Sequence, residues 1–420
     1  MPNDVKKGII YRCIVIAFAI TYTLSVQAYD FQNDGLFYDI ISEAERTVAV
    51  VSAPNNKLYT GSFLIPGSVT QNVTGISYKV IAIVDNAFEQ CSVISVTIPE
   101  TVTSIGRSAF SDCTQLKSVT ILGNVTSIGR SAFSGCTQLE SVTISEGVAS
   151  IGDNAFRSTR LTSVTIPGSV TSIGDSAFSN TRLTSVTIPR SVTSIESYTF
   201  SGCTQLKSVT ISEGVTTSEG ITSIESYAFS DCTQLKWVTI SEGVTTIGNN
   251  AFSNTGLTSV MIPGSVTTIG DNAFSDTGLT SVTIPESVTS IGDDAFWNCS
   301  QLYEFICKPT NAPQCTGSPF SLISQWCKLY VPKGSTGYDA WSPYFAEIIE
   351  VDFGGIDVPQ KGSETIRIVG RNLMVENVAL QGNISIYNPN GQLIRSVIPD
   401  PSSKQICIEG LDKGMYFVVL

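Results

Sequence analysis

The sequence predicts a repeat solenoid of about ten units with a parallel sheet along one face, followed by a small β-sandwich. Three observations lead to this fold class. A phenylalanine, usually preceded by alanine, recurs mostly every 22 or 23 residues. Leucine, valine and isoleucine recur at fixed offsets between the phenylalanines. No single unit could bury these side chains alone, so neighbouring units must stack. The recurring phenylalanines are Phe88, Phe110, Phe133, Phe156, Phe178, Phe200, Phe229, Phe252, Phe274 and Phe296.

Residues 1–28 are expected to be an export signal. Basic residues precede the apolar run from Cys13 to Leu24, and small residues up to Ala28 suit a cleavage site. The alternative is a membrane anchor, but the run of 12 residues is short for a span of about 30 Å of hydrocarbon. We therefore expect a mature chain that begins near Tyr29 and has no membrane span.

Residues 29–80 are expected to form an N-terminal β cap. Phe37, Tyr38 and Ile40 lie in one apolar stretch, and Val48 and Val50 alternate in the next. This alternation is typical of the strands of a hairpin, and such a hairpin would cover the open end of the stack.

One unit of the segment 81–306 illustrates the repeat. Leu161, Val164 and Ile166 occupy relative positions 1, 4 and 6, which predicts a short strand whose alternate side chains point inward. Pro167 follows and ends the strand without leaving a donor unpaired, and Phe178 then fills the coil. This spacing is typical of leucine-rich repeats.

The pattern ends near Cys307, and residues 307–352 are expected to form a C-terminal cap. Residues 356–420 change character again, because segments 366–369 and 384–387 alternate as strands and Asn388 begins a turn sequence. We expect a small β-sandwich there.

The outward face of the predicted sheet carries the candidate ligand-binding residues. Positions 3 and 5 of nearly every strand are serine and threonine, a pattern that β-propensity alone also explains. Regular threonine rows also occur in ice-binding proteins, which is a second interpretation. Trp237 and Met261 interrupt the ladder on strands expected to be adjacent, and with Thr239 and Ser259 they form our candidate site. Drift between repeats is the alternative explanation of this irregularity.

Cysteine and threonine share one position, three residues after the phenylalanine. Neighbouring units would place their Cα atoms near 4.8 Å, so bridges such as Cys113 to Cys136 are possible. Interchange with threonine favours buried free thiols instead, while Cys307 could bridge Cys315 or Cys327 in the cap. The shared position holds Cys91, Cys113, Cys136, Cys203, Cys232 and Cys299, and Thr159, Thr181, Thr255 and Thr277.

The composition argues against catalysis, cofactors and nucleic acid. The chain has no histidine, which removes the usual base of hydrolytic triads and the commonest zinc ligand. Its net charge of −12 disfavours binding to phosphates. Asp153, Asp175, Asp271 and Asp293 recur once per repeat at equivalent loop positions, which indicates turns, and single carboxylates cannot form a calcium cage. We therefore expect no enzyme, no cofactor and no metal.

The pattern L-x-x-V-x-I-P-x-x-V-x-x-I-x-x-x-A-F over about residues 80–306 resembles the BspA-type, or Treponema-type, leucine-rich repeat. Segments beginning at Tyr29 and at Leu329 are similar to caps of Bacteroidetes members. The segments beginning at Ile384 and Leu411 resemble the C-terminal sorting domain of type IX secretion. The resemblance implies a secreted or outer cell-surface protein, and some members of the family are adhesins.

Two classes of function follow from these expectations. The first is a binding module that mediates protein–protein or cell-surface adhesion, with a protein or glycan of the host matrix or of neighbouring cells as partner. The second is a structural spacer without a ligand, or an accessory module of a carbohydrate-active or proteolytic enzyme. An enzyme would need a catalytic domain, and every segment already has another assignment.

Overall fold

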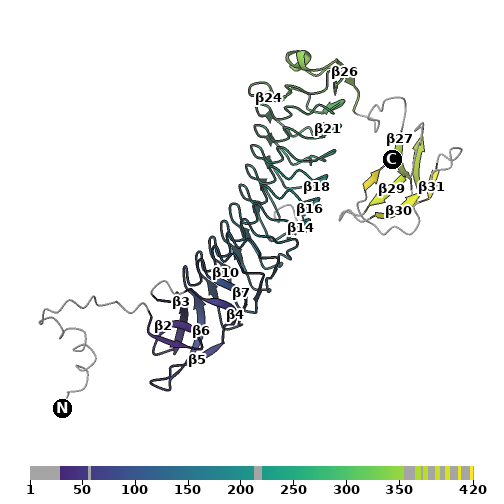
Figure 1. The fold of residues 1–420 in the computed structure, drawn as a ribbon. Coiled ribbons are helices and arrows are strands. Elements are labelled where there is room, and N and C mark those ends of the chain that lie inside the picture. Colours follow the sequence, from purple (N-terminus) through teal and green to yellow (C-terminus); the bar gives the residue numbers. More distant parts are fainter. Residues whose placement is uncertain are drawn as a thin grey trace, which may run out of the picture.

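A computed structural model describes residues 29–54, 58–211 and 220–353 in full, and beyond these only the backbone of six strands between 365 and 419. The expected solenoid is confirmed: successive coils stack in one row from the purple to the green end of the chain (Figure 1). The expected export signal at residues 1–28 lies outside the described residues.

The front sheets run along one edge of the stack, where β7, β14, β16, β18 and β21 follow one another (Figure 1). Their strands pair in parallel, as predicted. The front strands are β4 (Thr60–Leu64), β7 (Ser92–Ile98), β9 (Ser118–Ile121), β11 (Ser141–Thr143), β14 (Ser185–Ile188), β16 (Ser208–Ile211), β18 (Trp237–Thr239), β21 (Ser281–Ile284), β23 (Glu304–Cys307), β25 (Lys328–Pro332) and β26 (Glu347–Val351).

The back sheets consist of two-residue parallel strands, one from each coil. All of these strands except β24 hold the isoleucine of the return path, which points into the core. The back strands are β8 (Ser104–Ile105), β10 (Ser127–Ile128), β12 (Ser150–Ile151), β13 (Ser172–Ile173), β15 (Ser194–Ile195), β17 (Ser223–Ile224), β19 (Thr246–Ile247), β20 (Thr268–Ile269), β22 (Ser290–Ile291) and β24 (Gln314–Cys315).

An antiparallel meander closes the N-terminal end of the stack. Tyr38 of its middle strand pairs with Phe31 on one side and with Val50 on the other. The third strand, β3, pairs in parallel with β6, and β6 pairs in parallel with β8, the first of the short back strands. The meander and its neighbours are β1 (Phe31–Asn33), β2 (Leu36–Ser42), β3 (Thr47–Val51), β5 (Ser68–Thr70) and β6 (Ser77–Ile83).

Aromatic side chains close the C-terminal end. Phe305 and Phe320 meet Trp341 and Phe345 at ring-centroid distances of 4.8 to 6.3 Å, and this cluster covers the last ring of the repeat column. Trp341 lies on η2 (Tyr338–Tyr344), a short 3-10 helix. In the fully described ranges no helix is long and apolar enough to cross a membrane.

The C-terminal segment supplies two three-stranded antiparallel sheets, in the orders β27-β28-β31 and β30-β29-β32. The segments 366–369 and 384–387 that we predicted as strands lie in β27 and β29. The expected turn at Asn388 lies outside the described residues. The strands are β27 (Thr365–Val369), β28 (Asn372–Glu376), β29 (Ile384–Tyr387), β30 (Leu393–Val397), β31 (Gln405–Cys407) and β32 (Phe417–Val419).

The repeated phenylalanines form one continuous stack of rings through the solenoid. From Phe88 to Phe296 all ten are fully buried, and successive ring centroids lie 4.7 to 5.6 Å apart. The rings of Phe133 and Phe156, for example, are only 4° from parallel. Each ring therefore contacts both neighbouring coils, which confirms that stacking buries what a single unit would expose.

A glycine at the end of most back strands lets the coils approach each other closely. A Cβ atom on Gly152 would lie 2.7 Å from the backbone nitrogen of Arg130, and one on Gly174 would lie 2.6 Å from that of Asp153. Glu196 occupies the equivalent place in the next coil. Among the described strands the back ladder is interrupted here, between β13 and β15, but it continues from β15 to β17 although Glu225 stands at the same position in the following coil.

The front ladder is also interrupted, and the strand we predicted at 161–166 is not formed; within the fully described ranges, a second gap falls at 257–262. Both segments follow a shorter corner: four residues separate Phe156 from Leu161, whereas five separate Phe133 from Leu139. In each case the preceding coil has the longer corner, and the coil with the gap is the first that has the shorter one. Because the corner is one residue shorter, the chain reaches the front side at a different position. Its segment therefore does not pair with the preceding front strand.

Candidate functional site

The front face carries regular rows of outward hydroxyl groups, as the sequence predicts. Ser95, Ser118 and Ser141 are register partners on three neighbouring strands, and the threonines two residues later form a parallel row. Intervening valines point inward. The rows are interrupted at the two gaps in the ladder, so the face consists of separate panels.

Trp237 and Thr239 lie on β18, where they pair with Ser208 and Thr210 of β16. Both side chains are half-buried rather than fully exposed. The indole Nε1 and the threonine Oγ1 are buried and have no hydrogen-bond partner within the described part of the chain. Trp237 therefore presents less surface to a partner than the sequence indicates.

Ser259 and Met261 lie in the second gap of the front ladder. The Met261 side chain is 70% exposed, but its segment is not a strand. In the described ranges a single backbone hydrogen bond, from Thr258 N to Lys236 O at 3.5 Å, joins this segment to that of Trp237. The expectation of adjacent paired strands was wrong, because the short corner before Leu257 displaces the segment. Trp237 and Thr239 thus lie on a paired strand, whereas Ser259 and Met261 do not.

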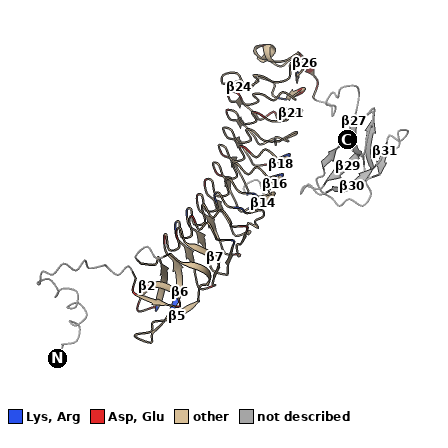
Figure 2. Cartoon of the chain, in the orientation of Figure 1, with Lys and Arg blue, Asp and Glu red and all other residues tan. Residues whose placement is uncertain are grey.

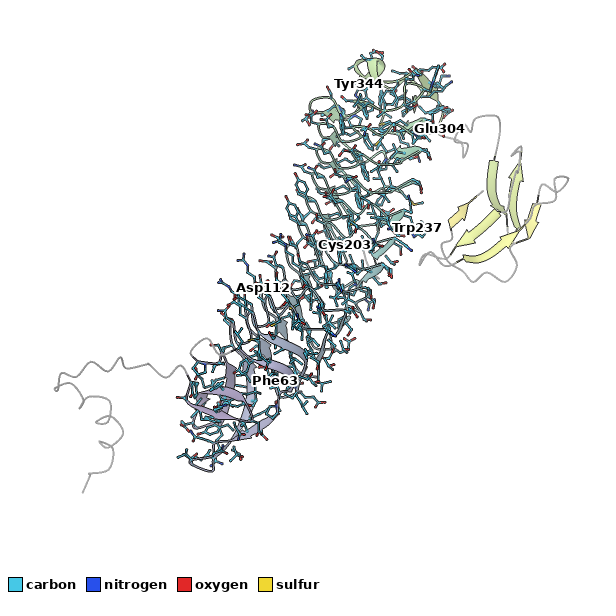
Figure 3. All side chains as sticks on the ribbon, viewed as in Figure 1. Phe63, Asp112, Cys203, Trp237, Glu304 and Tyr344 are labelled. Carbon is cyan, nitrogen blue, oxygen red and sulfur yellow. The ribbon has the colours of Figure 1, made fainter. Side chains whose placement is uncertain are left out.

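The chemistry of the front face changes at its C-terminal end. One outward row runs from Ser281 to Glu304, Lys328 and Glu347. The next row runs from Thr283 to Ile306, Tyr330 and Ile349. Hydroxyl rows thus give way to charged and apolar rows on the last three strands. Figure 3 places Glu304 and Trp237 along the same edge of the solenoid.

A hollow of about 430 Å³ lies on these last strands. The exposed fraction is 46% for Tyr303 and 69% for Trp326, whereas Tyr330 is buried. Lys328 Nζ lies 2.7 Å from Glu347 Oε2. This hydrogen bond raises the pKa of Lys328, and burial with the nearby Glu304 carboxylate raises the pKa of Tyr330. The lining residues are Tyr303, Glu304, Trp326, Lys328, Tyr330 and Ala346.

Sequence reasoning missed this hollow. Tyr303, Trp326 and Ala346 belong to three different segments, and only the parallel register of β23, β25 and β26 brings them together. The available signal was a pair of large aromatics, Tyr303 at the end of the expected repeats and Trp326 in the expected C-terminal cap, which precede β23 and β25.

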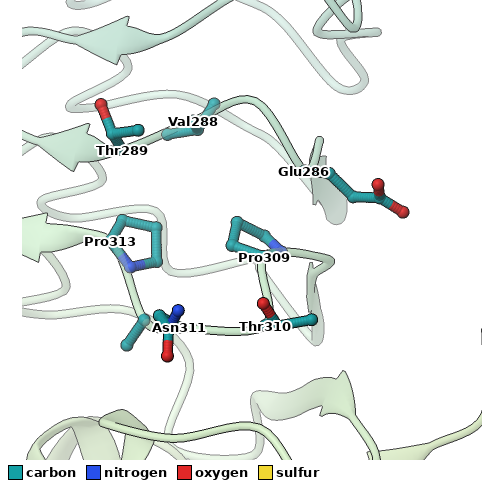
Figure 4. Close-up of a pocket in the computed structure, with 8 residues that line it drawn as sticks. Glu286, Val288, Thr289, Pro309, Thr310, Asn311 and Pro313 are labelled. Atoms are coloured by element: carbon teal, nitrogen blue, oxygen red, sulfur yellow. The ribbon is translucent and has the colours of Figure 1, made fainter.

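A second hollow of about 380 Å³ lies between the last coils (Figure 4). Glu286 is the only titratable side chain that lines it, beside Thr289 and a chain segment from Pro309 to Pro313. Asn311 in that segment accepts a hydrogen bond from Thr336 at 2.7 Å. This hollow offers no pair of groups for acid–base chemistry.

The irregular residues on the loop side form a separate cluster. The rings of Tyr198 and Tyr227 stack at 4.6 Å and 4°, and both residues have positive φ. Beside them a shallow hollow of about 410 Å³ is lined by Asp153, Asp175 and Glu196, among others. These tyrosines lie in turns on the loop side and not on the front face with Trp237.

The repeated cysteines are buried and donate hydrogen bonds to backbone carbonyls. Cys113 Sγ lies 2.9 Å from the Phe88 carbonyl oxygen, and Cys136 Sγ lies 3.0 Å from that of Phe110. Burial raises the pKa of Cys203 to about 11 and that of Cys136 well above its ordinary value. Such thiols are poor nucleophiles, because the thiolate is the reactive form.

The cap cysteines are also free thiols. The bridge that we considered between Cys307 and Cys315 or Cys327 is not formed in the structure. Burial raises the pKa of Cys307 to about 12 and that of Cys315 to about 11. Among the fully described residues no group of three cysteine or acidic side chains is arranged to hold a metal ion.

Charged residues are scattered along a mostly uncharged solenoid (Figure 2). The stacked coils of 22 to 23 residues, with parallel strands on the front and short strands on the back, define a leucine-rich repeat solenoid. The family model described as the BspA type leucine rich repeat region matches residues 81–207 and 211–314, in six copies. The match covers more than half of the chain, and the chain belongs to this family.

Several solved structures are similar to this chain. A leucine-rich repeat protein from Bacteroides ovatus is 25% identical, with a TM-score of 0.51 over 77% of this chain and 100% of that one. A leucine rich cell surface protein from Faecalibacterium prausnitzii is 28% identical over 75% of this chain and 97% of that one, with a TM-score of 0.41. The pneumococcal vaccine antigen PcpA is 17% identical over 77% and 98%, with a TM-score of 0.37. No curated protein matches the chain significantly.

Proposed function

We propose that this chain is a secreted or cell-surface protein that binds other proteins through the front face of its solenoid, and that it has no catalytic activity. The observation that carries the proposal is the front face itself. Its parallel strands present outward side chains in register, and the face ends in exposed aromatic residues. Such an extended surface, held by a rigid core, suits contact with a macromolecule.

The absence of histidine and the burial of the repeat thiols support a non-enzymatic role. Cys203 and Cys299 are held in the neutral form by burial, which raises their pKa to about 11. They donate to carbonyl groups at 3.2 Å and thereby stabilise the coil corners. These thiols therefore stabilise the fold and do not act as nucleophiles.

Export and surface attachment belong to the same proposal. The apolar run from Cys13 to Leu24 supports passage across the inner membrane. The resemblance of the C-terminal segment to a type IX sorting domain supports passage across an outer membrane. Adhesion to host matrix or to neighbouring cells is the role that we propose there.

A binding screen tests this function. The full chain is immobilised and exposed to purified extracellular matrix proteins and to surface extracts of neighbouring bacteria, and captured proteins are identified and then titrated individually. Thr187→Arg places a bulky charge on the exposed front face, while Ser172→Arg does so on an exposed back strand. We expect Thr187→Arg to weaken binding and Ser172→Arg to leave it unchanged. If the chain captures no protein, it is a spacer and the proposal is wrong. Equal effects of both variants would exclude the front face as the binding surface.

A further inference from the structure

The hollow at the C-terminal end of the front face has exposed aromatic walls. Tyr303 and Trp326 are the two most exposed aromatic side chains among the fully described residues, and in these residues neither ring stacks on another aromatic ring. Free aromatic faces beside a hollow of about 430 Å³ are available to a ligand group.

The charges in and beside the hollow do not balance, because Lys328 of the lining is paired with Glu347, which lies outside the lining. Lys328 forms its ion pair with Glu347, whereas in the described part of the chain Glu304 has no hydrogen-bond or ion-pair partner. The pair is about half exposed, with side-chain exposures of 45% and 55%, so it can rearrange at little cost. Lys328 can pair with either Glu347 or Glu304, and the other carboxylate then remains unpaired. The hollow therefore favours a cation.

We propose that this hollow receives an arginine side chain of a protein partner, with Glu304 accepting the guanidinium hydrogen bonds and Trp326 and Tyr303 contacting its faces. The proposal rests on the proposed function and names the chemistry of its partner. A guanidinium is planar, stacks on aromatic rings and forms two parallel hydrogen bonds to a carboxylate. A lysine ammonium matches the charge but cannot form that bidentate contact.

The same lining is less suited to a neutral glycan. A sugar would use several hydrogen-bonding groups to fix its hydroxyls, and the hollow has no amide side chain among its lining residues. Its polar groups are two ionised side chains, Glu304 and Lys328, and the buried Tyr330. Charge and ring area therefore favour a protein partner over a carbohydrate.

Fluorine NMR of the full chain, labelled with 5-fluorotryptophan, provides the test. The chain has four tryptophans, and the Trp326 signal is assigned with Trp326→Phe. Capped pentapeptides that carry arginine, lysine or glutamine between glycines are titrated, with methyl glucoside as a sugar probe. Glu304→Gln removes the unpaired charge. Glu140→Gln is the control, because Glu140 is an exposed carboxylate directly before the equivalent front strand of another repeat.

We expect the arginine peptide to shift the Trp326 signal, the lysine peptide to do so more weakly and the glutamine peptide not at all. Glu304→Gln should weaken arginine binding roughly tenfold, since a charge-assisted contact is lost, and Glu140→Gln should not change it. An unshifted signal, an equal response to glutamine, or unchanged affinity of Glu304→Gln would overturn the proposal. A comparable shift with methyl glucoside would indicate a sugar site instead. If the peptides fail while the chain still captures proteins, the proposed function survives and only the arginine contact is lost.

Discussion

Phe178 lies at the junction, within the described coils, where both the front and the back ladders are interrupted. Its ring stacks on Phe156 at 5.4 Å and on Phe200 at 5.6 Å, the widest step in the column. Across this junction the backbone bonds that remain are at the corners and at the start of the front segment, such as Phe178 N to Thr199 O at 2.9 Å and Arg182 N to Leu161 O at 3.0 Å.

Phe178→Ala is therefore expected to divide the solenoid into two units that unfold separately. Truncation of a fully buried phenylalanine costs about 3–5 kcal/mol. In a stacked array this loss acts on the contacts of one coil with its two neighbours. Elsewhere the intact ladders still couple neighbouring coils after such a loss, whereas at this junction the coupling depends on the corner bonds and on the start of the front segment. Residues 29–178 and 183–353 should then melt at different temperatures.

The assay is calorimetry together with hydrogen exchange followed by mass spectrometry at increasing urea. Phe133→Ala is the matched control, because its ring is also fully buried but lies between continuous ladders, β9 with β11 and β10 with β12. The control should lose similar stability and keep one cooperative transition. A single transition in Phe178→Ala, with both halves exchanging together, would refute the reasoning.

Two further predictions concern the repeats. Gly152→Ala should lower the melting temperature, at a cost of about 1–3 kcal/mol, because its Cβ would lie 2.7 Å from a backbone nitrogen. Burial raises the pKa of Cys203 and Cys299 from 9.0 to about 11, so the folded state holds these protons more tightly. Stability should be unaffected by these thiols below pH 9 and should fall by up to roughly 3 kcal/mol per thiol as pH rises to 11; urea titrations across this range measure it, with Cys203→Ser showing a smaller decline.

The core of the fold was predictable because it depends on period alone. Phe133 and its equivalents recur at a fixed spacing, and a solenoid is the arrangement that buries one ring per coil on both sides. The interruptions were not predictable in the same way. Leu161 and Val164 belong to the same pattern as the residues of paired strands, and the difference lies in one missing residue of the preceding corner. The break in the back ladder beside Glu196 was not predictable either, because Glu225 stands at the same repeat position and the ladder is intact there.

The candidate site was predictable only in part. Trp237 lies on the front face as predicted, because alternation along a strand decides which side a residue faces. Its pairing with Met261 depended on a ladder that the short corner prevents. The hollow with Trp326 depends on the register among three segments with different loop lengths, and spacing alone does not supply that register.

Oxidative footprinting of the full chain, with and without a protein captured in the binding screen, tests the central claim most directly. Met261 is 70% exposed and Trp326 69% exposed on the front side, whereas Tyr198 is 43% exposed on the loop side. Binding through the front face predicts that the bound protein reduces oxidation of Trp326, and of Met261 if the contact extends that far, while Tyr198 is oxidised as before. Protection of Tyr198 with unchanged oxidation of both Met261 and Trp326 would contradict the account.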